Sequence, residues 1–325
     1  MYDKPVKYDK PFKTIEEQIN YLRSYHQLKI TDEEQAKYAL MNYSYYDLIN
    51  GYKDVFMQKD KFFDGENLEV ITKFLKVDKE IQNILLKYSA YVESRFKTIF
   101  AYYLSMYCGV HQDEYLSSKN YSFKYRPDKD RWVFKGTINS IYKYLNKPIQ
   151  EIDNPTRHYR YNHNHVPAWI LFKNITFNDC TQLFKFIKQE VKNKVISEML
   201  INKEIDDTYR NQFLINSLTI VRKYRNIIAH NLNFVNTRLK RYSIVFSKLE
   251  QNKLINELPN KKYSNSPFAM IVCLSYLLDK EMGETFLSDL KSVFERIINK
   301  YGDDIFKRYC KISDIPEDIL HRLED

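Results

Sequence analysis

Apolar side chains recur every three to four residues along most of the chain, which is the spacing of one buried face of an α-helix. Near the N-terminus, Ile15, Ile19 and Leu22 repeat in this way after the capping pattern Thr14-x-x-Glu17. The longest unbroken example lies between residues 78 and 107 and consists of Ile81, Leu85, Tyr88, Val92, Phe96, Ile99 and Tyr103. We therefore predict amphipathic helices as the main elements.

Further helices are predicted on the same grounds at residues 31–43 (with the cap Thr31-x-x-Glu34), 45–56, 67–75, 137–145, 168–172, 178–192, 206–230, 267–278, 284–299 and 316–322. Two stretches are predicted to be irregular: residues 109–136, which are rich in charge, and residues 148–167, which prolines bound. We find no hairpin signal, no repeat of fixed period and no long heptad run. The predicted fold class is all-α.

The pattern divides the chain into three expected parts. Residues 1–65 read as an extended arm, with Pro5 and Pro11, followed by a helical subdomain. Residues 66–245 read as a helical core, and residues 246–325 as a C-terminal helical extension. A chain of 325 residues is long enough to bury a hydrophobic core in this arrangement.

Composition narrows the function classes. With only 6 Gly and no GxGxxG or GxxxxGK[ST] loop, the common routes to ATP or dinucleotide binding are disfavoured. The net charge of +9 favours a polyanionic partner, either nucleic acid or an anionic membrane, although a generally basic composition would have the same charge. The 28 Tyr and 20 Phe favour nucleic acid with unpaired bases as the partner, because aromatic rings stack on such bases. Most of these rings are nevertheless expected in the core.

We expect neither a membrane-spanning segment nor a bound metal or cofactor. The N-terminus has no apolar segment of the signal-peptide kind, and the longest apolar run, residues 268–278, is too short to span a bilayer. We therefore expect a soluble, cytoplasmic protein. The four cysteines form no CxxC pair, and His163-x-His165 has only Glu151 and Asp153 as nearby carboxylates, which makes a metal site a weak alternative.

The segment from Arg222 to Asn231 carries the strongest candidate for chemistry. On a helix, Arg222, Asn226 and His230 are spaced by four residues and share one face, and Arg225 flanks that face. This set combines a charged planar donor, an amide and an imidazole. An isolated Arg and His five residues apart occur by chance in many helices, whereas the longer string around them, RNxxAHN, is far more specific.

These side chains suit metal-independent cleavage of RNA, in which the 2′-OH attacks the neighbouring phosphorus. Histidine can act as the acid or the base, and arginine can bind the phosphate oxygens. Asparagine can orient the histidine or donate to phosphate. If two copies met across a dimer axis, one composite site would contain two histidines and two arginines.

Two basic and aromatic stretches are candidate RNA contacts. Arginines would bind phosphate and aromatic rings would stack on bases, with a solvated surface as the alternative interpretation. The first lies in the predicted loop and contains Arg157, His158, Tyr159 and Arg160. The second contains Arg126, Arg131 and Trp132.

The segment Arg225-Asn226-x-x-Ala229-His230-Asn231 resembles the R-x4-6-H signature of HEPN domains, in the form found in Abi-like (AbiD/AbiF-type) abortive-infection proteins. Other landmarks of that family occur in the same order and cover roughly residues 10–240. They are Lys10-Pro11-Phe12-x-x-Ile15-x-x-Gln18-x-x-x-Leu22, Asn42-Tyr43-x-Tyr45-Tyr46-x-Leu48-Ile49-x-Gly51-Tyr52, Val92-Glu93-x-Arg95, Val166-Pro167-Ala168-Trp169-x-Leu171-Phe172 and Thr176-Phe177.

The resemblance implies a HEPN-like helical bundle, often dimeric, that acts as a metal-independent endoribonuclease in defence against phage, in some members together with a structured non-coding RNA. It assigns catalytic roles to Arg225, Asn226 and His230. It also places Glu93 and Arg95 on a helix beside the motif, so that Glu93 could pair with Arg225. The sequence departs from the family at Lys173, where many members are acidic, and at Asn231, where many have a second histidine.

Three functions are therefore compared. The leading hypothesis is a defence ribonuclease restrained by an RNA or by a second subunit, since an unrestrained ribonuclease would be toxic. The second is a non-catalytic protein that holds a structured non-coding RNA. The third and weakest is a toxin that modifies RNA or a protein side chain.

Overall fold

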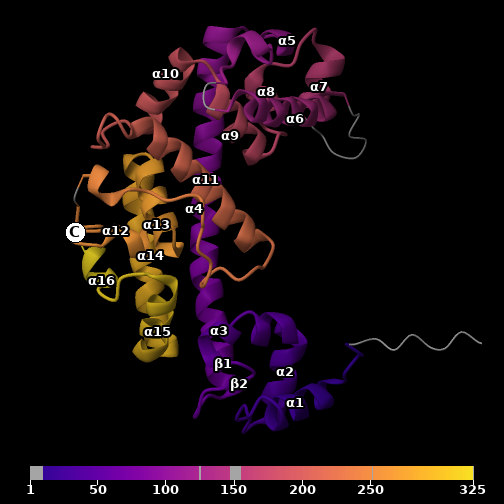
Figure 1. Cartoon of the computed structure of the whole chain (residues 1–325), viewed down its shortest axis with the longest axis vertical. Helices are drawn as coiled ribbons and strands as arrows, with labels where there is room; N and C mark the ends of the chain where they lie inside the picture. The colour runs from indigo at the N-terminus through magenta and orange to yellow at the C-terminus, as the bar shows by residue number, and fades with distance from the viewer. Residues whose placement is uncertain (1–9, 124–125, 147–154, 251, 325) are drawn as a thin grey trace, which may run out of the picture.

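The computed structural model describes residues 10–123, 126–146, 155–250 and 252–324. Within these ranges helices dominate, and the sheet is a two-residue hairpin in which β1 (Met57–Gln58) pairs with β2 (Lys61–Phe62). The all-α prediction is confirmed. Figure 1 shows one long central helix, α4, with the other helices arranged along it.

The central helix α4 (Leu68–Cys108) has 41 residues, which corresponds to roughly 60 Å. It begins at the cap Asn67, whose side chain accepts a hydrogen bond from the N–H of Val70, and it ends at Gly109, which has a φ of 94°. The prediction of two separate helices here was wrong. Asp78 suggested a new start, but its side chain is buried among other polar groups and caps nothing.

The N-terminal helices are α1 (Ile15–Ser24), α2 (Glu33–Tyr43), the π-helical turn η1 (Tyr46–Asn50) and α3 (Lys53–Phe56). The capping box of Thr14 and Glu17 is present as predicted. The start of α2 differs from the prediction, because Asp32 rather than Thr31 accepts the hydrogen bond that caps the helix. Most of the predicted extended arm lies outside the described residues.

The middle of the chain contains α5 (Gln112–Tyr115), the 3₁₀ turn η2 (Ser118–Asn120), α6 (Pro127–Asn146), α7 (Pro155–Asn162) and α8 (Ala168–Leu171). Two irregular stretches were predicted here, and both predictions were partly wrong. Pro127 and Pro155 occupy the first positions of α6 and α7, where a missing N–H removes no helical hydrogen bond. Residues 147–154 of the predicted loop lie outside the described residues.

The next helices are α9 (Phe177–Phe186), α10 (Gln189–Met199) and α11 (Arg210–Ala229). The single helix predicted at residues 178–192 is divided by a tertiary contact. Ile187 takes an extended conformation and bridges Tyr121, and the N–H of Lys188 donates to the carbonyl of Asn120 at 2.9 Å. The motif helix α11 starts later than predicted, because Asp206 forms a turn with Thr208.

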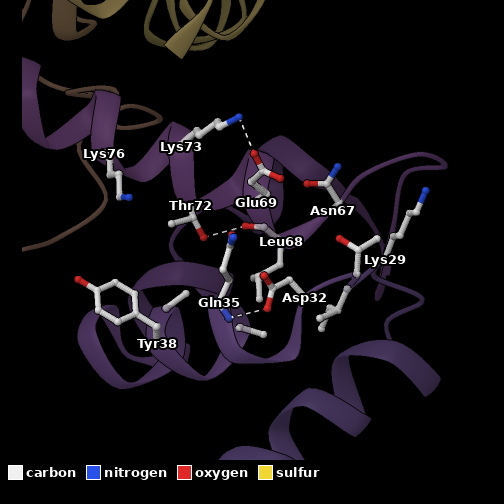
Figure 2. A pocket seen from close by; sticks show the side chains of 14 residues that line it. Lys29, Asp32, Gln35, Tyr38, Asn67, Leu68, Glu69, Thr72, Lys73 and Lys76 are labelled. Carbon is white, nitrogen blue, oxygen red and sulfur yellow. Dashed lines mark hydrogen bonds and ion pairs between the residues drawn. The ribbon is translucent and has the colours of Figure 1, made fainter. Parts of the chain in front are cut away.

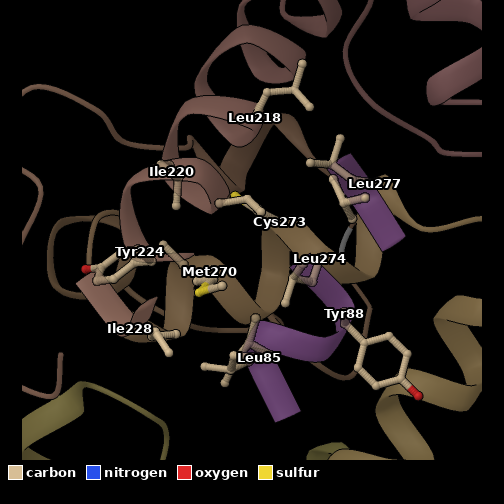
Figure 3. Packing of buried hydrophobic residues seen from close by; sticks show 14 of the residues in the cluster. Leu85, Tyr88, Leu218, Ile220, Tyr224, Ile228, Met270, Cys273, Leu274 and Leu277 are labelled. Carbon is tan, nitrogen blue, oxygen red and sulfur yellow. The ribbon is translucent and has the colours of Figure 1, made fainter. Parts of the chain in front are cut away.

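The C-terminal helices are the 3₁₀ turn η3 (Phe246–Lys248), α12 (Asn260–Tyr263), α13 (Pro267–Leu277), α14 (Lys280–Tyr301), α15 (Asp303–Ser313) and α16 (Ile319–Arg322). Nearly every side chain of α13 is buried, as expected for a helix that is apolar on all sides. It packs against α4, α11 and α14. Figure 3 shows Met270, Cys273 and Leu274 of α13 among Leu85 of α4 and Tyr224 and Ile228 of α11.

This packing positions the motif, because α11 lies across the middle of α4 and over α13. The central helix contacts α2, α10, α11 and α13 to α15, and α15 packs on its N-terminal part, where Tyr309 donates to Asp78. The buried apolar side chains form one cluster across these parts. The division into three segments remains a prediction. No helix in the described ranges combines the length and apolar character needed to cross a bilayer.

Candidate functional site

The motif lies in the last two turns of α11, whose apolar side holds it in place. Tyr224 and Ile228 are buried against α13. The hydroxyl of Tyr224 lies within hydrogen-bond distance of two backbone carbonyls, those of Thr237 at 2.9 Å and Asn265 at 2.8 Å. The end of α11 is therefore fixed from both sides, and its polar residues stand on a supported helix.

Arg225 is held by two acceptors. Its Nη2 donates to Glu93 Oε2 of α4 at 2.8 Å, and its Nη1 donates to Asn226 Oδ1 at 3.1 Å. The expected Glu93–Arg225 pair is thus present. Glu93 also binds Lys97 Nζ at 2.8 Å, one turn later on α4. Because the Arg225 side chain remains 35% exposed, part of the guanidinium faces solvent in a fixed orientation.

His230 stands just beyond the end of α11. The helix ends at Ala229, and the backbone N–H of His230 donates to the carbonyl of Asn226 at 3.0 Å. The residue is exposed, and its imidazole makes no hydrogen bond within the described part of the chain. A ring in this position is open to a ligand, but no protein group orients it here.

Asn231 terminates the motif and ties it to other elements. Its φ of 55° lies in the left-handed region, which asparagine tolerates better than most residues. Its Nδ2 donates to Asp47 Oδ2 of η1 at 3.1 Å, and its Oδ1 accepts a hydrogen bond from Lys79 Nζ of α4. In this structure Asn231 therefore joins α11 to α4 and to the N-terminal helices.

Arg222 lies one turn before Asn226 and is half-buried. Burial lowers the pKa of its guanidinium, and within the described residues its buried Nε has no hydrogen-bond partner. An unpaired buried donor is costly, typically by about 1–3 kcal/mol. Among the predicted contacts, Arg222 is thus the one with an unsatisfied polar group.

Arg95 points away from the motif. Its Nη1 donates to the carbonyls of Met199 at 3.0 Å and Leu277 at 2.8 Å, and its Nη2 donates to the carbonyl of Glu198 at 2.9 Å. These carbonyls belong to the last turns of α10 and α13, where helix carbonyls lack partners. Arg95 therefore fastens two helices to α4 and does not contact Arg225 or His230.

Because Arg95 joins two helix ends to α4, we predict that its replacement lowers stability. We expect Arg95→Lys to lower the free energy of unfolding by about 2 kcal/mol, because one ammonium cannot replace a guanidinium that spans two helix ends. Urea denaturation measures this change. Arg296→Lys is the control, since Arg296 forms an exposed ion pair with Glu80. Equal stability of the two variants would contradict the assignment.

The predicted RNA contacts of residues 157–160 lie on α7 and not in a loop. Arg157 and His158 are exposed, and Tyr159 packs its ring on His163 with 4.5 Å between centroids. Arg160 donates to the carbonyl of Leu145 at the end of α6. The exposed side chains also have neighbours: Arg157 lies over the ring of Tyr161 at 5.8 Å, and His158 Nδ1 lies 3.3 Å from Asn162 Nδ2.

The second predicted stretch surrounds the start of α6. Arg126 precedes this helix, and Arg131 and Trp132 lie in its first turns with exposed side chains. Trp132 is 76% exposed, which is unusual for so large an apolar ring. In Figure 1, α6 and α7 lie beside the C-terminal end of α4, whereas α11 crosses the middle of α4. The structure does not join these residues and the motif into one cluster.

A groove of about 450 Å³ lies between α4 and α8, and we call it the α4–α8 groove. Glu93, the partner of Arg225, lines it together with Lys97, Trp169 and Lys173. Trp169 is 46% exposed, and α8 packs against α7. Neither Lys97 nor Trp169 was predicted as a contact. The spacing Glu93-x-x-x-Lys97 could have predicted the ion pair. No sequence pattern could have predicted that Trp169 is exposed.

Another hollow, of about 330 Å³, lies between α2 and the first turns of α4 (Figure 2). It contains Lys29, Lys73 and Lys76, but Lys73 pairs with Glu69 at 2.6 Å and Asp32 supplies a second carboxylate. Its charges are largely balanced. In Figure 1, α2 and the first turns of α4 lie at the end of the molecule opposite α6 and α7.

Metal-ligating and nucleophilic side chains are dispersed. Within the described ranges, no group of three or more His, Cys, Asp or Glu side chains is placed to hold a metal ion. The four cysteines are buried and unpaired. Burial raises the pKa of the Cys273 thiol to about 12, so this thiol stays protonated at neutral pH.

Comparison with known proteins identifies the family. The profile of the family described as Abi-like protein matches residues 38–236, which is more than half of the chain. Neither a curated protein nor a solved structure matches the chain significantly. The matched range includes Glu93 and Trp169 and ends shortly after His230. The chain therefore belongs to the Abi-like protein family, and this membership supports a role in bacterial abortive infection.

Proposed function

We propose that this protein binds RNA during abortive infection and cleaves it, without a metal, at Arg225, Asn226 and His230. The observation that carries the proposal is the end of α11. There Glu93 and Asn226 orient a half-exposed guanidinium, and an exposed imidazole follows five residues later. A positioned cation and an accessible proton carrier are the two groups that attack by a 2′-OH requires.

Each residue has a distinct role in this mechanism. His230 removes the proton from the attacking 2′-OH or delivers one to the departing 5′-oxygen. Arg225 has five N–H donors, and those that Glu93 and Asn226 leave free bind the oxygens of the crowded phosphorane. The amide nitrogen of Asn226 supplies a further donor to phosphate. Glu93 acts as a positioning residue, because it touches Arg225 and not the RNA.

A second copy of the chain would complete the site. Cleavage by this route requires both a base and an acid, and one motif contains a single histidine, since residue 231 is Asn. Two motifs that meet across a dimer axis would supply both proton carriers. We therefore include a homodimer through the face of α11 in the proposal.

The α4–α8 groove suggests how RNA approaches the motif. An unpaired base stacked on Trp169 would lie beside Lys97 and Lys173, and its strand would lead from Glu93 and Arg225 toward α7. Stacking on an aromatic ring contributes roughly 1–3 kcal/mol per base. Arg157 and His158 of α7, and on α6 Arg131 and Trp132, would then contact more distant parts of the RNA.

The alternative function is a protein that holds a structured RNA without cutting it. Two observations favour it: the imidazole of His230 has no orienting partner in the described residues, and Glu93 competes with phosphate for Arg225. In that case Arg225 and the groove still bind RNA. RNA binding is common to both functions, and cleavage separates them.

Bound RNA can be detected directly. We expect the purified protein to retain nucleic acid, with a ratio of absorbance at 260 to 280 nm above that of protein alone, and sequencing of the extract to identify one discrete structured RNA. Ribonuclease and deoxyribonuclease treatment of the extract are the controls. A clean protein, or a random mixture of cellular RNA, would count against a cognate RNA partner.

A further inference from the structure

A cavity separate from the motif lies between α9, α10 and α11, with a volume of about 520 Å³; we call it the α9–α11 cavity. Its lining is strongly basic. Lys185, Lys188, Lys192 and Arg241 line it, and Asp130 is the one carboxylate among the described lining residues. The volume lies within the range of about 300–1,000 Å³ that is typical of small-molecule sites.

Among the described residues that line this cavity, four basic side chains stand against one carboxylate. Lys188 Nζ donates to the carbonyl of Tyr107 at 3.1 Å, and Lys192 Nζ donates to the carbonyl of Lys185 at 2.9 Å. Carbonyl oxygens satisfy hydrogen bonds but carry no net charge. Lys192 is only 9% exposed, so water screens its charge weakly. An anion would therefore be attracted into the cavity.

The N-terminus of α10 adds to this field. The helix has 11 residues, and Lys188 stands at its cap position without any side-chain hydrogen bond to the first turn. The first N–H groups of a helix have no partner within the helix, and they coincide with the positive end of its dipole. Together with the lysines, they form the arrangement that binds phosphate at helix N-termini.

The opposite wall is suited to a base. Asn211, Gln212 and Asn216 of α11 bring amide groups to the cavity, and the half-buried ring of Tyr242 also lines it. Gln212 Nε2 donates to Asn216 Oδ1 at 2.7 Å, and Asn216 Nδ2 donates to the carbonyl of Ser243 at 2.7 Å, so a base would pair with Asn211 or with the amide oxygen of Gln212. Amides pair with the donor and acceptor edges of bases, and an aromatic ring stacks on their faces. In the described part of the chain, the buried Oδ1 of Asn211 has no hydrogen-bond partner.

We propose that the α9–α11 cavity binds a nucleotide, with its phosphate at the N-terminus of α10 and its base against the amides of α11 and Tyr242. The nucleotide can belong to an RNA strand or be a free effector. The geometry favours RNA. Ile215 and Thr219 in the cavity share one face of α11 with Arg222 and Asn226, since these residues follow one another at three or four positions. Thr219 and Asn226 are about 10 Å apart along the helix axis.

The test compares charge removal inside and outside the cavity. Lys185→Gln/Arg241→Gln changes two exposed lining residues and should leave the fold intact. Lys280→Gln/Lys311→Gln removes the same charge from exposed positions on α14 and α15. The probes are a fluorescent 12-nucleotide RNA with 2′-O-methyl groups, which the proposed cleavage cannot cut, and ATP and UMP measured by calorimetry. Circular dichroism melting verifies that all variants are folded.

We expect the cavity variant to bind the RNA at least tenfold more weakly at low salt than the control variant. The slope of log K against log salt should fall in magnitude by about 1.4, since each phosphate contact on a single strand contributes about 0.7. If ATP or UMP binds to wild type and control but not to the cavity variant, the nucleotide is a free effector. Equal affinities of the two double variants for every probe would overturn the proposal.

Failure of this proposal is distinguishable from failure of the proposed function. Binding of the 2′-O-methyl RNA does not depend on catalysis by His230, so a protein that never cleaves RNA can still show the difference between the two double variants. Conversely, if the protein cleaves RNA but the α9–α11 cavity binds no nucleotide, cleavage would be observed and both double variants would bind the probe equally.

Discussion

Alanine at His230 is expected to slow RNA cleavage in EDTA by about 10²–10⁴-fold, the usual contribution of a general acid or base. The side chain is exposed and forms no hydrogen bond in the described residues, so its removal should change the chemistry without unfolding the protein. Arg225→Ala should produce a comparable loss, because it removes the charge that faces the phosphate. Protection against phage should fall with cleavage.

The controls replace the same residue types at other exposed positions. His321→Ala removes a histidine whose partner is Glu324 on the surface, and Arg296→Ala removes an arginine that pairs with Glu80. Cleavage of a labelled RNA in single-turnover reactions gives the rates, and plating with phage gives protection. If folded His230→Ala and Arg225→Ala variants protect as well as the controls, the catalytic part of the proposed function is wrong.

The second large effect is expected at Asp78, which is 1% exposed. Its carboxyl group accepts hydrogen bonds from the hydroxyls of Tyr52 at 2.7 Å and Tyr309 at 2.9 Å, and from Gln82 Nε2 at 2.8 Å. These partners come from the N-terminal helices, from α15 and from α4 itself. Asp78→Ala leaves three buried donors without an acceptor, each at a cost of about 1–3 kcal/mol.

We therefore expect Asp78→Ala to lower the free energy of unfolding by at least about 3 kcal/mol, and Asp78→Asn to cost less because an amide oxygen still accepts. Urea denaturation at pH 7 measures both. The control is Asp318→Ala, which removes an exposed carboxylate that pairs with Arg322. A loss at Asp78→Ala no larger than at the control would show that the buried cluster does not join the helices.

The same residue gives a pH dependence. Burial raises the pKa of Asp78 above its ordinary value, so the folded state holds this proton more tightly than the unfolded chain. The contribution of Asp78 is therefore fully present below the unfolded pKa of about 4 and is lost as pH rises toward the folded pKa. Asp78→Asn cannot ionise, and its stability relative to wild type should increase as pH rises above about 4. Parallel stability curves would contradict this.

Much of the fold could be predicted because its signals are local. The capping box at Thr14 and the all-apolar helix α13 were visible from neighbouring residues alone. The wrong predictions of helix boundaries occurred where the surrounding structure gave a residue a different role from the one its local sequence suggested. Pro127 and Pro155 begin helices although they suggested loops. The break between α9 and α10 depends on Tyr121, which is remote in sequence from Ile187.

By itself, the sequence determined that Arg222, Arg225 and Asn226 lie together near the end of one helix, since helical spacing places residues three to four apart side by side. It predicted His230 as part of that helix, whereas the structure ends the helix at Ala229. The tertiary structure alone decided which groups surround them. It brought Glu93 to Arg225, Trp169 to the groove, and the lysines of α9 and α10 to the amides of α11. Backbone hydrogen bonding and side-chain periodicity act over a few residues, so they can be predicted from the sequence. The contacts between helices depend on which buried faces pack together. Many apolar faces of this chain look alike in the sequence, and only packing in the folded chain distinguishes them.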